Sequence, residues 1–576
     1  MLLSEVRFQD SIKLNNYFLS KEKFEKYSDD IYYYINGFIF SSHSKDMIIN
    51  AVLNSNKKLF KEFIGEFSII IYSKSNNRIF ILNDKTGRNL IYYSQKNHLS
   101  ISEDFWSIVK YNSFTLEDID SISLKEHVFF YVSLEYHTIL KGLDILPNAS
   151  YVVIEKDSIE IEKYWYFKLE ENSYTIDEKY DMLDKSFDDT MRKINEVNND
   201  VITYGIGVSG GMDSRLLPYY AFKYNMNLNS YIIGEEKPNK LFKSNDHISS
   251  DLIVDYFKLN HQKMDYNELS YKEKNRIDAI YNPIGTSQIF KIPNINNINF
   301  DMLLTGASGF IVGASPFYSS VKNLSIESLI FDKQTSLKLR KKYVRIYKGI
   351  NYITNTNIFD TKDILQNSIE GLIDKSEVDI LKNNLDKFLN TMDFLTKTEK
   401  LMNYAIGILG HRNKSGSFES LVNHKTNYTL YTTYTLEMMK YLDEDDIYDR
   451  KLFEDFIKER LPELATIKGQ DHKTSIVNAT PNFFKKLFSI IEFSIRGQGV
   501  MNYHNWVNSL EFTSYIESTL GQYNYVSKYF DMDKVSKLTK SGELNSIVIA
   551  NIIKHNEVMY LIDNIKEEYD GLYNNK

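Results

Sequence analysis

The residues best suited to chemistry in this chain form a short polar loop with two adjacent glycines, SGGMDS at residues 209–214. Two adjacent glycines let the backbone turn sharply and approach a ligand closely, and the N–H groups at the start of a helix attract anionic oxygens. Ser209 and Ser214 add hydroxyl donors. Asp213 on its own would repel a phosphate group, so its presence indicates a Mg²⁺ ion between the carboxylate and a pyrophosphate. The loop therefore predicts a site for a magnesium-bound phosphate ligand.

The elements around this loop are expected to hold it at the edge of a sheet. Residues 201–208 are a nearly continuous apolar run, typical of a strand buried in a parallel sheet. A helix is predicted at residues 214–224 and another at 248–259, with further strands at 229–234 and 301–305. This alternation predicts a doubly wound α/β domain.

A plain Gly-Gly turn between a strand and a helix, without a ligand, is the alternative interpretation of the loop. The GxxxxGK[ST] spacing of the Walker phosphate loop is also absent. The strand before the loop and the helix after it favour the phosphate site, because a phosphate loop needs both.

The first part of the chain is predicted to be rich in strands. Residues 67–72 and 78–82 are short runs of β-branched and aromatic residues, and the polar residues between them predict a hairpin. A similar run lies at residues 31–35, and a second hairpin is predicted at residues 150–161. Residues 175–198 are polar with a helical pattern and are predicted to link this part to the α/β domain.

Composition excludes several classes of site. The 576 residues contain no cysteine, which excludes disulfides, thiolate metal sites and a cysteine nucleophile. The net charge of −8 argues against broad nucleic-acid binding. The N-terminus has no secretion-signal pattern, and no apolar stretch approaches the roughly 18 residues of a spanning helix. We therefore expect a cytoplasmic protein with no nucleic-acid partner and no membrane span.

Four segments of the first part resemble, in the right order, the class II glutamine amidotransferase domain of asparagine synthetases. They are FIGEFSI at 63–69, NDKTGRNLIYY at 83–93, TILKGLDILPN at 138–148 and the pair Tyr164-Trp165. The loop that follows resembles the SGGxDS loop of ATP pyrophosphatases, which adenylate a carboxylate and release pyrophosphate. The resemblance covers roughly residues 55 to 475.

This resemblance implies an α/β fold preceded by a β-rich domain. A class II amidotransferase-like β-sandwich is expected at residues 1–170. An asparagine-synthetase-like ATP-pyrophosphatase (PP-loop) domain is expected at residues 180–576, doubly wound, with a helical insertion at about 318–400 and a helical C-terminal part. The implied cofactors are ATP and Mg²⁺, with Asp213 as the metal ligand. The implied ATP-binding residues are Val208, Ser209, Gly210, Gly211, Asp213, Ser214, Ile232, Gly234 and Gly306.

The chain departs from the family at the glutaminase nucleophile, which is a cysteine at the mature N-terminus. Ser4 is internal and has no basis for replacing it. We interpret the first domain as a structural one that packs against the synthetase domain, with Asp84 and Arg88 holding a turn. β-Lactam synthetases and lasso-peptide cyclases of this superfamily also lack the glutaminase, because their substrates already carry the amine. Arg215, in place of the usual second serine of asparagine synthetases, also favours this branch.

A second departure lies in residues 304–313, where the family has a loop with a second metal-binding Asp and a Glu or Tyr of the acceptor pocket. Ala307 stands at the Glu or Tyr position, and Gly309 or Phe310 at the Asp position. Losing one of two carboxylates should weaken Mg²⁺ binding unless water or Asp246 compensates. The change favours a less charged acceptor pocket and leaves open that the protein is a poor enzyme or none.

Residues 412–434 resemble the family's stretch with the acidic residue that contacts the substrate amine. Glu419 is the candidate for that role, and a shift of the alignment by four residues would place Asn423 there instead. A surface Glu on a helix is the alternative interpretation.

Residues 461–473 resemble the family segment with a lysine near the α-phosphate, where it stabilises developing charge. Lys468 and Lys473 both lie near the expected spacing and are the candidate catalytic lysines. A solvated surface lysine is the alternative for either residue.

These patterns predict an ATP-dependent, AMP-forming ligase that does not use glutamine. It would adenylate the carboxylate of a small molecule or peptide and transfer it to an amine, in natural-product, modified-peptide or cell-envelope biosynthesis. A protein of the same pathway is a further candidate partner. The alternatives are a catalytically degenerate homologue that acts as a binding or partner subunit, and an ammonia-dependent asparagine synthetase.

Overall fold

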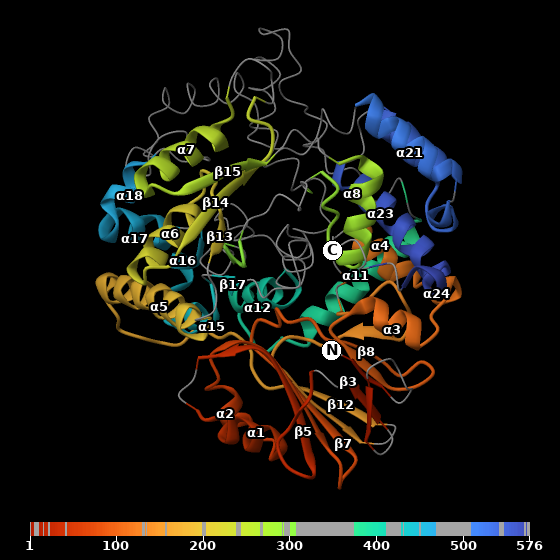
Figure 1. The fold of residues 1–576 in the computed structure, drawn as a ribbon, viewed down its shortest axis with the longest axis horizontal. Coiled ribbons are helices and arrows are strands. Elements are labelled where there is room, and N and C mark those ends of the chain that lie inside the picture. The colour runs from red at the N-terminus through yellow and green to blue at the C-terminus, as the bar shows by residue number, and fades with distance from the viewer. Residues whose placement is uncertain are drawn as a thin grey trace.

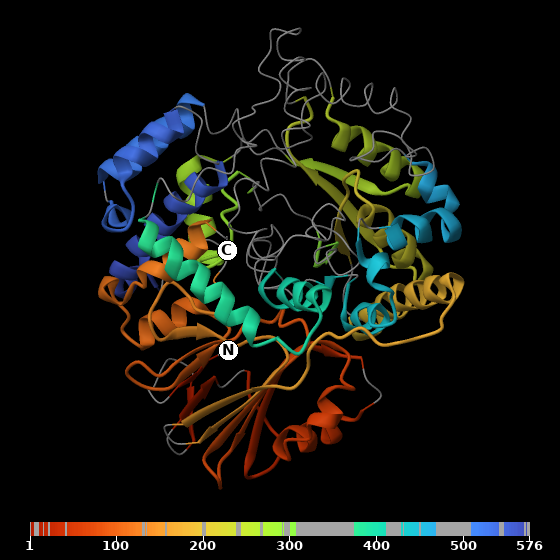
Figure 2. The same ribbon diagram turned by 180° about the vertical axis from the view of Figure 1, so that it is seen from behind.

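The structure is a computed structural model that describes most residues within 2–306, 372–409, 428–467 and 509–572. Figure 1 shows a β-sandwich at one end, with a parallel-sheet group and a helical group side by side above it. Figure 2 shows α11 (Lys375–Asn390) and α12 (Lys397–Tyr404) running across the back of the molecule above the sandwich.

Among the described residues, the first part of the chain forms two six-stranded antiparallel sheets. The first has the order β10-β8-β9-β1-β3-β2, with β1 (Leu2–Ser4), β2 (Ser11–Leu14), β3 (Tyr17–Ser20), β8 (Tyr92–Ser94), β9 (Ser100–Ser102) and β10 (Leu143–Ile145). The second has the order β12-β11-β7-β6-β5-β4, with β4 (Glu25–Lys26), β5 (Ile31–Ile39), β6 (Gly65–Ser73), β7 (Arg78–Asn83), β11 (Ser150–Glu155) and β12 (Ser158–Lys163). The predicted β-rich N-terminal part and both predicted hairpins are confirmed.

The central strand β6 is buried along its whole length, and most of its residues are apolar. Ile70 and Tyr72 pack between the two sheets with side chains such as Leu3. Phe67 and Ile69 point to the other face, into the core that also holds α1 (Lys45–Leu53) and α2 (Lys57–Phe60). Both faces of β6 therefore pack against apolar side chains.

The second part is built on a five-stranded parallel sheet with the order β15-β14-β13-β16-β17. Its strands are β13 (Tyr204–Gly207), β14 (Leu228–Ile233), β15 (Asn260–Met264), β16 (Met302–Thr305) and β17 (Tyr428–Thr429). The chain leaves β13 for β14 and β15 and then returns to the other side of β13 at β16. Ligands of open parallel sheets bind at such a reversal, outside the carboxyl ends of the strands.

Helices α5 (Ile176–Val197), α6 (Asp213–Lys223) and α7 (Asn245–Phe257) accompany this sheet. The predicted linker at 175–198 is helical as expected. Thr175 and Glu178 form a capping box at its start, and Phe187 and Met191 are buried in the core. The same side of the molecule carries α15 (Thr433–Met439), α16 (Glu444–Ile447), α17 (Lys451–Arg460) and α18 (Pro462–Thr466).

The helical group combines segments that are distant in sequence. It contains α3 (Phe105–Tyr111) and α4 (Ser121–Phe129) of the first part with α8 (Tyr271–Tyr281), α21 (Leu510–Gln522), α22 (Met532–Lys540), α23 (Ser546–Asp563) and α24 (Ile565–Glu568). None of the helices in the described ranges combines the length and apolar character that a membrane crossing requires. Of the predicted insertion at 318–400, the structure describes mainly α11 and the start of α12.

Candidate functional site

The SGGMDS loop connects β13 to α6 at the carboxyl edge of the parallel sheet, where the strand order reverses. Its two serines close the loop on itself. The backbone N–H of Ser209 donates to Oγ of Ser214 at 2.9 Å, and the two hydroxyl oxygens lie 3.2 Å apart. The N–H of Gly211 donates to Oγ of Ser209 at 3.3 Å. The loop is therefore a compact turn that two hydroxyl groups hold in shape.

Helix α6 starts without a capping side chain, because Met212 occupies its N-cap position. By contrast, α5, α7 and α8 start after Thr175, Ser244 and Ser270, whose hydroxyl groups accept from the first turn. Without such a cap, N–H groups of the first turn remain suited to an anion.

The carboxylate of Asp213 lies against the ends of two neighbouring strands. A Cβ atom on Gly306, which directly follows β16, would be 2.4 Å from Cβ of Asp213 and 2.9 Å from its Cγ. Only glycine fits there without a shift of one of the two residues. The sequence predicted Gly306 in the same site as Asp213, and the structure brings the two residues into contact.

Tyr431, which follows β17, donates a hydrogen bond from its hydroxyl group to Oδ1 of Asp213. The tyrosine is fully buried, and its ring meets Phe187 and Phe453 edge-on at centroid distances of 5.8 and 6.2 Å. The sequence did not single out Tyr431. The feature that could have identified it is its position directly after β17, the strand that pairs with β16.

Arg215 lies directly after the loop and is almost completely buried, with 1% of its surface exposed. Its Nη2 donates to the carbonyl oxygen of Gly210 and its Nη1 to that of Leu464, both at 3.4 Å. Burial lowers the pKa of Arg215 to about 10, so the guanidinium still carries its charge at neutral pH.

The remaining predicted residues divide into two groups. Val208, whose N–H donates to the Tyr231 carbonyl at 2.8 Å, lies at the carboxyl end of β13, and Ile232 and Gly234 lie at that of β14. Asp246 is buried in the first turn of α7. The others lie outside the described residues: Glu419, Asn423, Lys468, Lys473, Ala307, Gly309 and Phe310.

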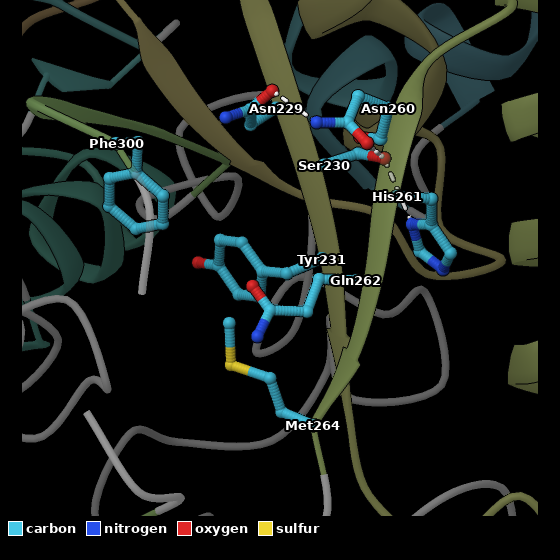
Figure 3. Close-up of a pocket in the computed structure, with 8 residues that line it drawn as sticks. All are labelled: Asn229, Ser230, Tyr231, Asn260, His261, Gln262, Met264 and Phe300. Atoms are coloured by element: carbon cyan, nitrogen blue, oxygen red, sulfur yellow. Dashed lines mark hydrogen bonds between the residues drawn. The ribbon is translucent and has the colours of Figure 1, made fainter. Parts of the chain in front are cut away.

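A pocket of about 140 Å³ lies on the parallel sheet, mainly along β14 and β15. Figure 3 shows the Tyr231 and Phe300 rings and the Met264 side chain on one side of these strands, with the Ser230–His261 hydrogen bond on the other. The pocket is lined by Asn229, Ser230, Tyr231, Asn260, His261, Gln262, Met264 and Phe300. Typical ligand pockets measure about 300–1,000 Å³, so this pocket is too small for a nucleotide.

The first strand of the N-terminal sandwich ends in a buried serine. Ser4 is fully buried in β1, and its hydroxyl group lies 3.0 Å from that of Ser100. Asp84 accepts from the backbone N–H groups of Thr86 and Gly87 at 2.7 and 3.0 Å, so it holds the turn as predicted.

Comparison with known proteins bears on the N-terminal part. Residues 32–165 match the family model of the glutamine amidotransferase domain. No curated protein matches the chain. The antiparallel N-terminal domain thus resembles a class II glutamine amidotransferase.

Two solved structures show distant similarity. One is glutamine phosphoribosylpyrophosphate amidotransferase from B. subtilis, complexed with ADP and GMP, at 8% identity and a TM-score of 0.16, over 38% of this chain and 50% of that chain. The other is described as the allosteric regulatory enzyme of purine biosynthesis, at 8% identity and a TM-score of 0.18, over 45% and 58% of the two chains. The matches thus span between half and three fifths of those proteins, and the assignment of the N-terminal domain rests on the family match.

Proposed function

We propose that this chain, whose amidotransferase-like domain lacks a nucleophile, is a glutamine-independent ligase that joins a carboxylate to an amine at the expense of ATP. The observation that carries the proposal is the SGGMDS loop, closed by its own serines at the reversal of the parallel sheet, with Asp213 between Gly306 and Tyr431. A glycine-rich loop at this edge suits a pyrophosphate group.

The proposed reaction has two steps. A carboxylate oxygen of the acyl substrate attacks the α-phosphorus of ATP, and the bond to the leaving pyrophosphate breaks. The amine then attacks the acyl carbon of the adenylate and loses a proton, and the bond to AMP breaks. The products are an amide, AMP and pyrophosphate.

In this scheme the loop binds the β- and γ-phosphates and orients the α-phosphorus towards the acyl substrate. Val208, Ile232 and Gly234, at the strand ends, line the remainder of the nucleotide site. Lys468 or Lys473 stabilises charge at the α-phosphate, and Glu419 contacts the amine. These last roles rest on the sequence resemblance.

Asp213 is the residue that would hold Mg²⁺. The described residues contain no group of three or more His, Cys, Asp or Glu side chains that could hold a metal. One carboxylate fits Mg²⁺ nonetheless, because this ion is commonly bound by one or two carboxylates together with substrate phosphates. When bound, the ion would neutralise charge on the phosphate oxygens.

The acyl and amine substrates are proposed by class alone. By analogy with superfamily members that lack a glutaminase, the amine belongs to the substrate itself or to a second molecule, in natural-product, modified-peptide or cell-envelope biosynthesis. A second candidate function, a binding or partner subunit without catalysis, is favoured by Ala307 and Phe310 in place of acidic residues. The same replacements disfavour an ammonia-dependent asparagine synthetase.

Calorimetric titration of the protein with ATP, with and without Mg²⁺, tests this proposal. We expect metal-dependent binding that Asp213→Ala abolishes. Asp393→Ala, which removes an exposed carboxylate paired with Lys400 at 2.6 Å, serves as the matched control and should bind normally. AMP release in the presence of candidate acids and amines then identifies the substrate.

The outcomes separate the candidates. Absence of ATP binding by the unaltered protein at millimolar concentration would refute the ligase. Normal binding without AMP formation from any acid would favour the binding subunit.

A further inference from the structure

The cation below the phosphate loop has an unusual environment. Among the described residues, the guanidinium of Arg215 contacts two backbone carbonyl oxygens, those of Gly210 and Leu464, and its Nε has no hydrogen-bond partner. No acidic side chain of the described part pairs with it. Both contacts measure 3.4 Å, which is long for a charged donor.

Such a charge is costly in the unliganded protein. A buried ion without a counterion loses its hydration and gains little in return. Folded proteins rarely bury an arginine unless it is paired. The cost falls when a polyanion binds near the guanidinium, because the attraction between the opposite charges is poorly screened by water in the interior.

The side chain of Arg215 also connects the phosphate loop to α18. It reaches back to the loop at Gly210 and across to the end of α18 at Leu464. The Gly210 carbonyl belongs to the peptide group between the two glycines, the most adaptable peptide of the loop. A donor on this carbonyl therefore restricts the orientation of the neighbouring N–H groups.

We propose that Arg215 is a positioning residue of the phosphate loop: it fixes the Gly210 peptide against α18 and supplies a positive charge that a bound pyrophosphate-bearing ligand compensates. This inference rests on the proposed function, since it names the ligand of the same loop as a pyrophosphate-bearing nucleotide. It goes further by assigning part of the ligand's affinity to a residue that does not touch it.

The test compares Arg215→Met with the unaltered protein. Methionine keeps much of the apolar stem and removes the charge. We expect the melting temperature without ligand to stay equal or to rise, because an uncompensated buried ion is gone. We expect the affinities for Mg·ATP and for Mg·pyrophosphate to fall by about tenfold or more, and the affinity for adenosine to stay the same. Arg215→Lys keeps a charge but loses the planar guanidinium. Its affinities for Mg·ATP and Mg·pyrophosphate should lie between those of Arg215→Met and the unaltered protein.

Arg276→Met is the matched control. Arg276 is paired with Glu557 at 3.0 Å and with Glu568 at 2.7 Å, in the helical group. Its replacement should lower the melting temperature and leave all three affinities unchanged.

Two results would overturn the inference while leaving the proposed function intact. One is unchanged affinity of Arg215→Met for Mg·ATP and Mg·pyrophosphate. The other is a large drop in melting temperature with parallel loss of adenosine and ATP affinity, which would mark a purely structural arginine. Failure of the unaltered protein to bind either phosphate ligand would overturn both proposals.

Discussion

Tyr431 holds the carboxylate of Asp213 with a single hydroxyl group, and its ring is fixed independently by the aromatic core. A hydrogen bond donated to a carboxylate favours the ionised form and restricts its rotation. In Tyr431→Phe the ring packing survives and the hydroxyl group is lost. We expect the Mg²⁺ concentration needed for half-maximal ATP binding to rise by about threefold to tenfold. We also expect the unfolding free energy to fall by about 1 kcal/mol.

A titration of Mg²⁺ at fixed ATP measures this effect. Tyr434→Phe is the control, because Tyr434 lies three residues further on and stacks on Phe40 at 5.5 Å. An unchanged Mg²⁺ requirement in Tyr431→Phe would show that the hydroxyl group does not position Asp213.

The sequence could predict only those parts of the site whose residues lie close together along the chain. The glycine pair, the serines and Asp213 lie within six consecutive residues, and Gly306 follows an apolar run that reads as a strand. Tyr431 lies 218 positions from Asp213 and Leu464 lies 249 from Arg215, so their contacts depend on how distant elements pack. No spacing rule reports such contacts from a single chain.

At the level of elements, the turn at residues 84–88 connects the sandwich to α15. Lys85 is buried, and its ammonium group contacts Glu437 of α15 and donates to the Lys61 carbonyl at 2.7 Å. Glu437 keeps a second partner, Lys440, at 2.7 Å. The Lys85–Glu437 pair is thus a charged link between the sandwich and α15, beside the hydrogen bonds between Gly65 and Thr433.

A double-mutant cycle tests this link. Lys85→Met should lower the unfolding free energy by about 3 kcal/mol, the low end for a broken buried pair, because Glu437 retains Lys440. Lys85→Met combined with Glu437→Leu should lose less than the sum of the single changes, with a coupling of about 1 kcal/mol or more in urea unfolding. The exposed pair Lys26–Asp29 is the control and should show no measurable coupling, because water screens the two charges. Additive single changes at Lys85 and Glu437 would contradict the link.

The strands show which elements sequence patterns miss. The predicted strand at 31–35 continues to Ile39, because Gly37 takes a φ of +83° and keeps the pairing with β6; a Cβ there would lie 2.0 Å from the Glu66 carbonyl oxygen. Strand β1 was not predicted. It has only three residues, and its pairing with β9 at Leu3 and Ile101 connects positions far apart in sequence.

At the scale of the whole molecule, the N-terminal part and the rest of the chain share both large hydrophobic cores. One core joins Phe60 and Tyr164 of the sandwich to Tyr220 and Phe456 of the parallel-sheet group. The other joins the side chains of α3 and α4 to those of α8 and α23. The amidotransferase-like domain therefore contributes apolar surface to both cores.

The second core also contains a polar cluster between α4, α8 and α23. His127 of α4 donates from Nδ1 to the Ile284 carbonyl at 2.6 Å, and its ring lies 5.8 Å from that of His555. Lys554 donates to the Asn282 carbonyl at 3.1 Å, and Asp278 accepts from Ser287 at 2.7 Å. Burial lowers the pKa of His127 to about 4 and holds the pKa of His555 well below its ordinary value.

These pKa shifts make the unfolding free energy of the protein depend on pH. Both imidazoles are neutral in the folded protein, whereas the unfolded chain protonates them below about pH 6.5. The unfolded state thus binds more protons as pH falls from about 6.5 towards 4, and the folded state loses up to about 1.4 kcal/mol per pH unit for each imidazole. Their contribution is complete above pH 6.5.

His555→Leu should therefore flatten the decline of stability in this window. Within the described residues, neither ring nitrogen of His555 has a hydrogen-bond partner, so leucine also removes two unsatisfied buried groups and should raise stability at neutral pH. Urea unfolding between pH 4.5 and 7.5 measures both effects. His137→Gln is the control, because Asp144 raises the pKa of His137 to about 9. The stability from this pair is present below pH 6.5 and is lost as pH rises towards 9, so the replacement should leave the decline of stability below pH 6.5 unchanged. A His555→Leu protein with the same acid slope as the unaltered chain would show that this buried cluster does not couple folding to pH.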